Sequence, residues 1–383
     1  MGKVTRRDFL RLSAGAAIAL GAAQGLAGCS NEPAAPKPTP GRGARVAAVR
    51  GTDLAAMTRQ ALEPLGGMGA IVKAGETVFI KPNMVTLPWA NLGRNPFING
   101  ECAKPEIVVA LAEECLRAGA KQVTIGDATQ MSTYSWDYAT TLDGSTNLVK
   151  EAARLNAAYQ PGTVRLACLD ADSPNWPEIP SRAGLDRPLV VSSLVTDADR
   201  VISVPVLKTH QWAQLSLSLK CFVGTTPLAR YGGSPDGLTP RVYLHVGTTG
   251  GIEQVFLDVV TAVKPDLAVI DGSICVEGNG PSVGAGLGQT VDMRNRLGSW
   301  LVLASTDLPA ADATAARIVK HDVAQIRQLN MAYEQQLGEI RQEEIEVVGE
   351  RLTDLLVDWL PATPAKPGQM SRHGYGPGAV AFA

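Results

Sequence analysis

Histidine and lysine side chains near the middle of the chain could carry acid–base chemistry. The 383 residues include four histidines, and two of them, His210 and His245, bracket a segment rich in glycine and proline. Imidazole titrates near neutral pH, so both are candidates for general acid–base catalysis or for metal ligation. Lys208 is a candidate catalytic group beside His210. The alternative is that both histidines are ordinary core or surface residues, and the composition alone does not decide between the two.

Three lysines follow or interrupt apolar segments, and they could bind an anion. Lys220 lies inside the apolar run 217–224, where burial of an ammonium group is costly unless an anion meets it. Lys81, Lys208 and Lys220 together would form a pocket suited to a carboxylate or a phosphate. The alternative is that each lysine extends its ammonium group to solvent.

Polar residues follow five of the predicted strands. They are Lys81-Pro82-Asn83, Gly126-Asp127, Leu207-Lys208-Thr209-His210, Asp271-Gly272 with Glu277 and Asn279, and Ser305-Thr306-Asp307. Ligands of open parallel sheets bind at the carboxyl ends of strands, so we expect one common site. For each cluster alone, a turn or a helix N-cap is the alternative, and Asp307 is a good N-cap candidate before Leu308-Pro309.

Within that common site, the residue types divide into substrate-binding and carboxylate groups. Asn83 and Asn279 would contact the substrate together with Lys81 and Lys220. The carboxylates would orient the lysines or bind a cation, and this metal-site candidate consists of Asp127, Asp271 and Glu277.

The elements that must position these residues alternate along the chain between strand-like and helix-like segments. Predicted strands cover 45–49, 77–80, 122–125, 164–169, 189–192, 201–206, 267–270 and 300–304, and predicted helices cover 54–65, 105–118, 251–263 and 308–319. This pattern predicts an α/β fold with a mainly parallel sheet flanked by helices. A division into two subdomains near residue 195 stays open, although no shift in composition marks a linker there.

Two segments are rich in glycine. Residues 225–241 surround Tyr231-Gly232-Gly233-Ser234-Pro235 and form either a lid or a surface loop. Residues 277–288 read EGNGPSVGAGLG, without a Walker lysine or the spacing of a dinucleotide-binding loop. Nucleotide binding is therefore disfavoured, and close approach of the backbone to another ligand is expected there.

Charge and cysteine spacing exclude several classes of function. The formal net charge is −2, and without a basic stripe the chain is not expected to bind nucleic acid. Cysteines 102, 115, 168, 221 and 275 are widely spaced with no C-x-x-C pair, so an iron–sulfur cluster or a zinc knuckle is not expected. The cofactor is otherwise unassigned, and a metal remains open.

The N-terminal residues predict export and lipid attachment. Arg6 and Arg7 precede Phe-Leu and a short apolar run, and Leu-Ala-Gly-Cys29 follows. The order matches a twin-arginine signal over 1–28 that ends in a lipobox, with lipidation at Cys29. The alternative is a transmembrane anchor, but the run is short and weakly apolar. Ser30 follows the cysteine where aspartate would favour inner-membrane retention, so the outer membrane is favoured.

The expected organisation follows from this signal. Residues 29–43 form a Pro-rich tether, 44–360 the α/β body and 361–383 a Gly/Pro-rich tail. The expected partners are the twin-arginine export machinery, the membrane through its lipid anchor and a small anionic ligand. The expected location is periplasmic or at the cell surface.

Several of these motifs also resemble one known family. They are Lys81-Pro82-Asn83, Lys104-Pro105-Glu106, Gly126-Asp127, Leu207-Lys208-Thr209-His210, Ser218-Leu219-Lys220 with Gly224, Arg241 with His245, Glu277-Gly278-Asn279-Gly280-Pro281, and Asp307 with Asp312. Over about 45–350 the chain resembles the family named domain of unknown function 362 (DUF362).

The chain also departs from this family in two ways. Many members carry a ferredoxin-like cysteine module that this chain lacks, and Cys221 stands where members usually have asparagine. A fainter similarity is to lactate-racemase-like proteins, whose paired histidines and lysine handle a hydroxy acid and a nickel-bearing cofactor.

Three functions are therefore weighed. The first is an exported, lipid-anchored enzyme that acts on a small anionic molecule. The second is a tethered protein that binds a small anion or a metal without turnover, and the third is a structural or partner-binding role. A histidine-like limb in the pH profile of turnover would separate the first from the second.

Overall fold

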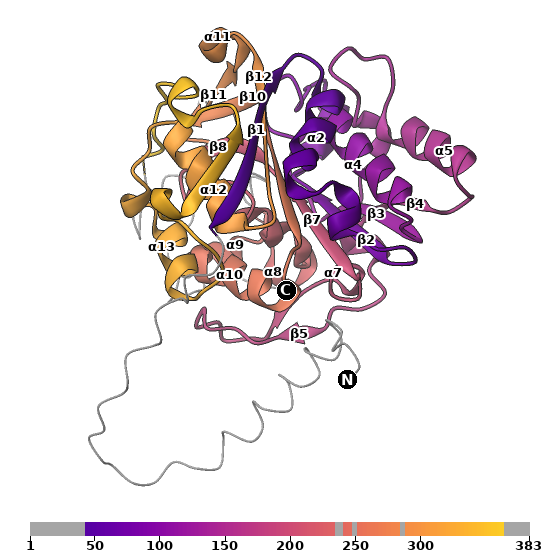
Figure 1. Cartoon of the computed structure of the whole chain (residues 1–383). Helices are drawn as coiled ribbons and strands as arrows, with labels where there is room; N and C mark the ends of the chain where they lie inside the picture. The colour runs from indigo at the N-terminus through magenta and orange to yellow at the C-terminus, as the bar shows by residue number, and fades with distance from the viewer. Residues whose placement is uncertain (1–42, 234–239, 247–250, 284–287, 364–383) are drawn as a thin grey trace, which may run out of the picture.

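One large sheet forms the centre of the computed structural model, which describes residues 43–233, 240–246, 251–283 and 288–363. Its strands lie in the order β13-β1-β12-β10-β7-β2-β3-β4 (Figure 1). Their bounds are β13 Ile345–Gly349, β1 Ala44–Gly51, β12 Trp300–Ser305, β10 Leu267–Gly278, β7 Arg200–Val204, β2 Thr77–Pro82, β3 Gln122–Asp127 and β4 Val164–Cys168. Strands β10, β7, β2, β3 and β4 run parallel, while β12 is antiparallel to both of its neighbours. The predicted α/β fold with a mostly parallel sheet is confirmed.

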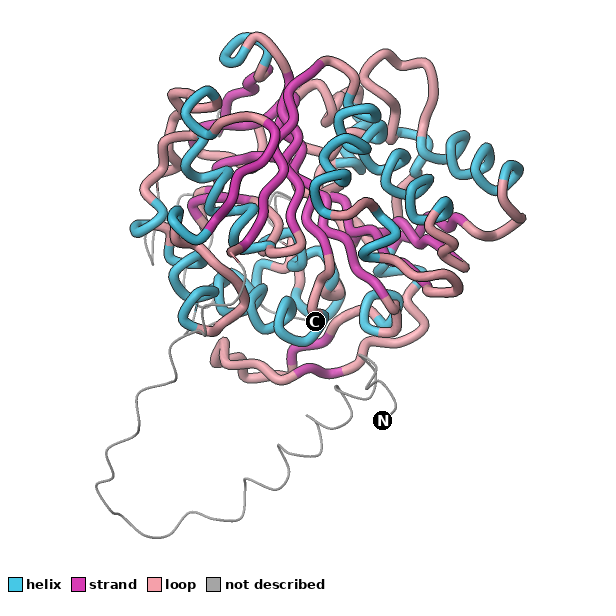
Figure 2. Tube along the Cα trace, viewed as in Figure 1, coloured by secondary structure: helices cyan, strands magenta, loops and turns pink. Residues whose placement is uncertain are grey.

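Helices cover both faces of this sheet. One group contains α2 (Leu54–Leu62), α4 (Pro105–Arg117) and α5 (Leu148–Ala158), and the other contains α10 (Gly251–Val263), α12 (Leu308–Ile318) and α13 (Arg327–Glu334). The two groups lie on either side of the strands (Figures 1 and 2). Every residue of β7 except its first, and every residue of β10 except its last, is buried, as expected for strands covered on both faces.

Local sequence signals fix the starts of these helices. The side chain of Asp53 accepts a hydrogen bond from Ala56 N at 3.0 Å and caps α2. Asp307 caps α12 in the same way through Ala310 N at 2.9 Å, so its N-cap role is confirmed. Pro105 occupies the first turn of α4, where its missing N–H leaves no helical hydrogen bond unmade.

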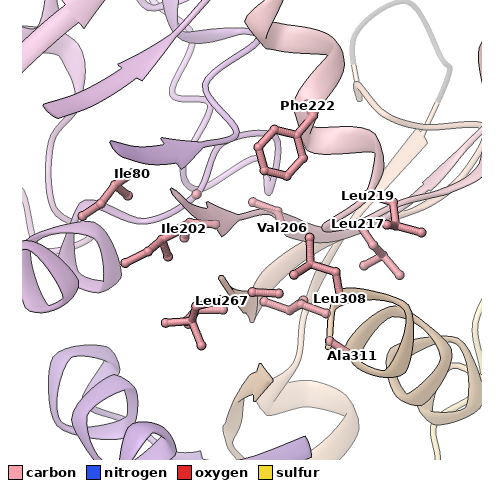
Figure 3. Close-up of a cluster of buried hydrophobic side chains, with 14 of the residues drawn as sticks. Ile80, Ile202, Val206, Leu217, Leu219, Phe222, Leu267, Leu308 and Ala311 are labelled. Carbon is pink, nitrogen blue, oxygen red and sulfur yellow. The ribbon is translucent and has the colours of Figure 1, made fainter. Parts of the chain in front are cut away.

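The hydrophobic core joins the sheet to the segment that carries Lys220. Figure 3 shows side chains from the strands, from residues 217–222 and from α12 in one cluster. The labelled members are Ile80, Ile202, Val206, Leu217, Leu219, Phe222, Leu267, Leu308 and Ala311, and all are buried. The apolar residues on both sides of Lys220 are therefore anchored in the core, whereas Lys220 itself is only partly buried.

The structure differs from the predicted strands around Pro205. A single strand was expected over 201–206, but β7 ends at Val204 and a new strand, β8 (Val206–His210), begins beyond the proline. Strand β8 pairs with β10 and with β9 (Gln214–Ser216). Lys208 and His210 are consequently strand residues, and they do not lie in a loop after a strand. Pro205 explains the break, because proline cannot donate a ladder hydrogen bond.

Two other expectations are refined by the sheet topology. The strand expected at 189–192 is β6 (Leu189–Val190), which pairs with β5 (Glu178–Ile179) outside the main sheet. The main sheet itself contains strands from both sides of residue 195, because β2 pairs directly with β7.

Residues 1–42, with Arg6, Arg7 and Cys29, and the tail 364–383 lie outside the described residues. Among the helices that the structure describes, none is both long and apolar enough to cross a bilayer.

Candidate functional site

Six of the residues singled out by the sequence line one cavity. They are Lys81, Asn83, Asp127, His210, Lys220 and His245. The cavity has a volume of about 110 Å³. Its walls come from the ends of β2 and β3, from β8, from the short helix η5 (Lys220–Thr225) and from α9 (Val242–Val246). A small ligand would therefore contact segments that lie far apart in the sequence.

Lys81 and Asp127 form a buried ion pair at the floor of the cavity. They stand at the carboxyl ends of β2 and β3, which are neighbouring parallel strands. Lys81 Nζ lies 2.6 Å from Asp127 Oδ1, and both side chains are almost fully buried. Asp127 Oδ2 also accepts a hydrogen bond from Met84 N at 2.6 Å. Burial raises the pKa of Asp127, and the Lys81 ammonium opposes that rise.

Gly224 allows η5 to lie directly against this ion pair. A Cβ atom at residue 224 would lie 2.4 Å from Asp127 Oδ1 and 2.9 Å from Lys81 Nζ. The carbonyl of Gly224 accepts a hydrogen bond from Ala128 N at 2.9 Å, which joins η5 to the end of β3. Only glycine fits this approach without displacing the buried charges.

Asp312 on α12 fixes the backbone just before Lys220. Its Oδ1 accepts hydrogen bonds from Ser218 N at 2.9 Å and from Ser218 Oγ at 2.6 Å, and its Oδ2 accepts one from Leu219 N at 3.1 Å. Burial raises the pKa of Asp312 to about 7, although these three donors oppose the rise. Asp312 is therefore a positioning residue for Lys220.

Lys220 is a half-buried cation whose ammonium group, within the described residues, makes no hydrogen bond or ion pair. Burial, together with the positive charge of Lys208, lowers its pKa to about 7. The other three cations that line the cavity are ion-paired: Lys81 with Asp127 at 2.6 Å, Arg94 with Glu101 at 2.8 Å and Arg241 with Asp170 at 3.0 Å. Among the cavity-lining cations that the structure describes, Lys220 is thus the one without a carboxylate partner.

His210 presents an N–H group to the cavity. Its Nδ1 accepts a hydrogen bond from Trp212 N at 3.0 Å, so the neutral ring carries its proton on Nε2. Burial lowers the pKa of His210 well below its ordinary value, and the charges of Lys220 and His245 add to the effect. The ring is therefore neutral at pH 7 and can donate from Nε2.

His245 has the opposite tautomer. Its Nδ1 lies 3.1 Å from the carbonyl oxygen of Arg241, and because a carbonyl can only accept, Nδ1 carries the proton and Nε2 is bare. Burial lowers the pKa of His245 to about 3, and the charge of Lys220 contributes. The ring lies edge-on to Trp212 with 5.9 Å between centroids. The cavity therefore holds one imidazole donor and one imidazole acceptor.

Arg241 supports His245 through its own buried contacts, and sequence reasoning gave it no role beyond the family motif. Its guanidinium donates to the carbonyls of Thr226 at 2.6 Å and Thr129 at 2.8 Å, and it pairs with Asp170. Its φ is +55°, so its carbonyl leaves the chain in an uncommon direction at the start of α9. No single sequence signal identified this anchor, because its partners are dispersed along the chain.

Lys208 does not line the cavity, although the sequence favoured it as a catalytic group. Its side chain is fully buried, and Nζ donates to Asn83 Oδ1 at 3.1 Å and to the carbonyl of Glu101 at 2.5 Å. Lys208 therefore holds the side chain of Asn83 through a hydrogen bond, and Asn83 itself lines the cavity.

The remaining predicted residues lie away from the cavity. Asp271 is buried against Lys104, with 3.3 Å between its carboxylate and the Lys104 ammonium. Glu277 pairs with Arg296 at 2.9 Å and accepts a hydrogen bond from Leu360 N at 3.0 Å. Neither Asp271 nor Glu277 therefore lines the cavity.

Asn279 binds the C-terminal segment. Its Oδ1 accepts a hydrogen bond from Thr363 N at 2.7 Å, so this side chain too lies outside the cavity wall. The sequence predicted that Asn279 would contact the substrate, but its side chain binds the chain's own backbone and does not line the cavity.

The candidate metal ligands are not gathered. Asp127, Asp271 and Glu277 have three different cationic partners, and within the described residues there is no group of three or more His, Cys, Asp or Glu side chains that could hold a metal ion. The carboxylates predicted as metal ligands are therefore not arranged as one ligand set in the part of the chain that the structure describes. The cysteines at 102, 115, 168, 221 and 275 are free thiols.

The two glycine-rich segments are anchored at their described ends. Tyr231 is fully buried, and its hydroxyl donates to Pro188 O at 3.0 Å. Gly280 packs on the backbone of β8, where a Cβ would lie 2.4 Å from Thr209 O. This close approach is to the protein's own backbone, whereas a ligand was expected. Residues 234–239 and 284–287 lie outside the described residues. The first of these ranges belongs to the segment 225–241, which was predicted to be a lid or a surface loop.

The solved structures that are similar to this chain include the following two. The lactate racemase apoprotein from Thermoanaerobacterium thermosaccharolyticum is 11% identical with a TM-score of 0.36, and the match covers 74% of this chain and 57% of that one. A protein from Thermotoga maritima is 12% identical with a TM-score of 0.36, and the match covers 76% of this chain and 59% of that one. The chain therefore spans less than two thirds of either neighbour.

Sequence comparisons identify the family. The thylakoid-associated protein sll1697 of Synechocystis sp. is 32% identical over 294 residues, which cover 74% of this chain and 75% of that protein. The family model described as domain of unknown function (DUF362) matches residues 78–317, the range that contains every cavity residue discussed above. This chain belongs to the DUF362 family.

Proposed function

We propose that this protein is an enzyme that binds a small anionic molecule at Lys220 and transfers a proton to and from it with His245 and His210. The observation that carries the proposal is the uncompensated Lys220 ammonium in a cavity that also holds two neutral imidazoles of opposite tautomer. An anion would supply the missing counter-charge. The imidazoles would supply an acceptor and a donor for the same ligand.

Anion binding would also activate the acceptor. The low pKa of His245 arises from burial and from the positive charge of Lys220. An anion beside Lys220 cancels that charge, so the pKa of His245 rises when the ligand binds. His245 Nε2 would then accept a proton from the ligand, and His210 Nε2 would donate one to an oxygen where negative charge develops.

One observation favours the second candidate, a tethered binding protein without turnover. In the ligand-free protein the pKa of His245 is about 3, which makes it a weak base until the ligand arrives. A binder would use both imidazoles as fixed hydrogen-bonding groups and would need no proton transfer.

Proton exchange with solvent separates the two candidates. Purified protein is incubated in D₂O with glycolate, lactate, alanine or pyruvate, and loss of each carbon-bound proton is followed by NMR. We expect at least one probe to exchange faster than in the protein-free blank. His245→Gln is expected to slow that exchange about 100-fold or more, because a positioned base contributes that much to proton transfer.

The matched control is His321→Gln, which removes a histidine that lies outside the cavity. This variant is expected to exchange protons as the wild type does. Binding of a probe without any enzyme-dependent exchange would contradict the enzyme and support the binder.

We also propose that the protein is exported by the twin-arginine route and anchored by lipid at Cys29, on the periplasmic or cell-surface side. The support is the order of Arg6, Arg7, the apolar run and Leu-Ala-Gly-Cys29. The name of the cyanobacterial relative, thylakoid-associated, also describes a protein found with a membrane.

The export proposal predicts two separable defects in the native host. Arg6→Lys with Arg7→Lys should leave the precursor in the cytoplasm, whereas Cys29→Ser should block incorporation of labelled fatty acid. Fractionation and labelling with an alkyne fatty acid measure both results. A full-length wild-type protein with residues 1–28 retained and no label would overturn the lipid anchor.

A further inference from the structure

Lys220 differs from the other buried lysines near the cavity because its amine is free to react. Lys81 is ion-paired with Asp127, Lys104 with Asp271, and Lys208 donates to Asn83 and Glu101. Within the described residues the amine of Lys220 has no such partner, and it lines the cavity beside His210 and His245. A lysine attacks a carbonyl carbon only through its unprotonated, unpartnered nitrogen.

Building on the proposed function, we propose that the small anion carries a carbonyl group next to its carboxylate, and that Lys220 Nζ forms an imine with that carbonyl. The composition of the cavity wall carries this inference: an amine without a partner among the described residues lines the same cavity as a bare imidazole nitrogen and an imidazole N–H. The lowered pKa of Lys220, about 7, supports it, since a substantial fraction of the amine is unprotonated at neutral pH.

The two histidines match the proton transfers that imine formation needs. The Lys220 ammonium first gives one proton to His245 Nε2, and Nζ then adds to the carbonyl carbon. The carbonyl oxygen accepts a hydrogen bond from His210 Nε2 and takes the proton back from His245. The new C–N nitrogen loses a proton to His245 Nε2, which gives a neutral carbinolamine. The hydroxyl then leaves as water with one returned proton, and a protonated imine remains. The Lys220 ammonium and the carbonyl compound therefore yield the protonated imine and one water, both histidines end as neutral imidazoles, and no oxidant or reductant is consumed.

The charge balance of the cavity favours a carboxylate on the adjacent carbon. The protonated imine keeps one positive charge on the Lys220 nitrogen, so the carboxylate retains its counter-charge after the covalent step. A cavity of about 110 Å³ suits a short chain. The substrate class is therefore a short 2-oxo acid, or the aldehyde acid of similar size.

Asp312 would act as the positioning residue for this step. It holds Ser218 and Leu219 through three hydrogen bonds, so the Lys220 side chain starts from a fixed backbone. Because Asp312 does not touch the cavity, it directs the amine without contacting the ligand.

Reductive trapping tests the inference. Full-length protein is mixed with pyruvate at pH 7.5 and treated with borohydride, and the adducts are located by peptide mass spectrometry. We expect a reduced pyruvate adduct at Lys220. Oxamate has the shape and charge of pyruvate but an amide in place of the ketone, so it should bind without being trapped and should compete with the labelling.

Lys220→Arg is the matched variant, because it keeps the positive charge but cannot form an imine. It should retain oxamate binding by calorimetry within about tenfold and lose the adduct. Wild-type protein that binds oxamate and pyruvate but gives no adduct, or gives one only at exposed lysines, would overturn the imine and leave the anion site intact. Wild-type protein that binds neither probe would overturn the imine together with the proposed function.

Discussion

Replacing Lys220 with methionine is expected to stabilise the ligand-free protein while removing its affinity for small anions. Methionine keeps most of the side-chain volume and removes a half-buried charge that has no partner within the described residues. We expect the free energy of unfolding at pH 7 to increase by about 1–2 kcal/mol, by the mechanism that makes uncompensated buried charges costly. The dissociation constant for oxamate should increase about 30-fold or more, because the ligand loses its charged partner.

The pH dependence of stability should change in the same variant. The pKa of Lys220 is about 7 in the folded protein, below its ordinary value of 10.5. Between pH 7 and pH 10.5 the unfolded chain therefore binds more protons than the folded protein, so the free energy of unfolding of the wild type should rise with pH across this window. This free energy should rise by about 2 kcal/mol in total, which is less than the difference between the two pKa values implies because the side chain is half-buried. Lys220→Met should flatten this rise in urea titrations.

Lys121→Met is the control for both measurements. Lys121 is an exposed lysine outside the cavity, so its replacement should change neither the stability slope nor the oxamate affinity. Unchanged oxamate binding in Lys220→Met would show that the anion does not use this lysine, and would contradict the site proposed above.

Replacing Lys81 with methionine is expected to cost about 3–5 kcal/mol of stability, the largest loss we expect from a single change in the site. Its partner Asp127 is almost fully buried, 2.6 Å away, and Lys81→Met would leave that carboxylate without its counter-charge. The pKa of Asp127, already raised by burial, would rise further without the Lys81 charge. The loss should therefore be smaller at pH 5, where the carboxylate is more readily protonated, than at pH 8.

A double variant isolates the pair. Adding Asp127→Asn removes the stranded charge and keeps an oxygen that can accept from Met84 N, so Lys81→Met with Asp127→Asn should recover at least half of the loss. The exposed pair Arg351 and Asp354 is the surface control, and Arg351→Met should cost less than about 1 kcal/mol. If urea denaturation showed that Lys81→Met also lowers the free energy of unfolding by less than about 1 kcal/mol, the charges of the buried Lys81–Asp127 pair would not stabilise the fold as proposed.

Four helices lie close to their predicted positions, whereas α5 and α13 were not predicted. Helix α10 has the predicted bounds of 251–263, and α4 ends one residue before the predicted 118. Both carry apolar residues at helical spacing, and Gly119 follows α4 with the positive φ of a helix terminator. Strand β8 was missed because its polar residues, Lys208 to His210, resemble the start of a loop. Its pairing with β10 and β9 depends on residues far away in the sequence.

The candidate site was predictable by residue type, but not by position. Lys81, Asn83, Asp127 and His210 belong to the polar clusters predicted after strands, and they line one cavity. Lys220 and His245 line the same cavity but were singled out by residue type alone. Asp271, Glu277 and Asn279 follow the same sequence rule, yet they bind Lys104, Arg296 and Thr363. Strand β10 runs on to Gly278, so Asp271 and Glu277 both lie within it, and Glu277 pairs with Gln289 of strand β11 (Gly288–Asp292).

The sequence alone determined the α/β class, the approximate bounds of four helices and the chemical groups available to the site, because periodicity, caps and side-chain chemistry are local properties. The tertiary structure decided which of those groups are free. Lys81, Lys208 and Lys220 are alike in sequence, but an ion pair, a pair of hydrogen bonds and an unpartnered cavity position give them three different roles. The tautomers of His210 and His245 were likewise set by the backbone atoms of Trp212 and Arg241. Whether each of these lysines is paired or free depends on residues that are distant in the sequence. Those residues become neighbours only when the sheet and η5 pack together.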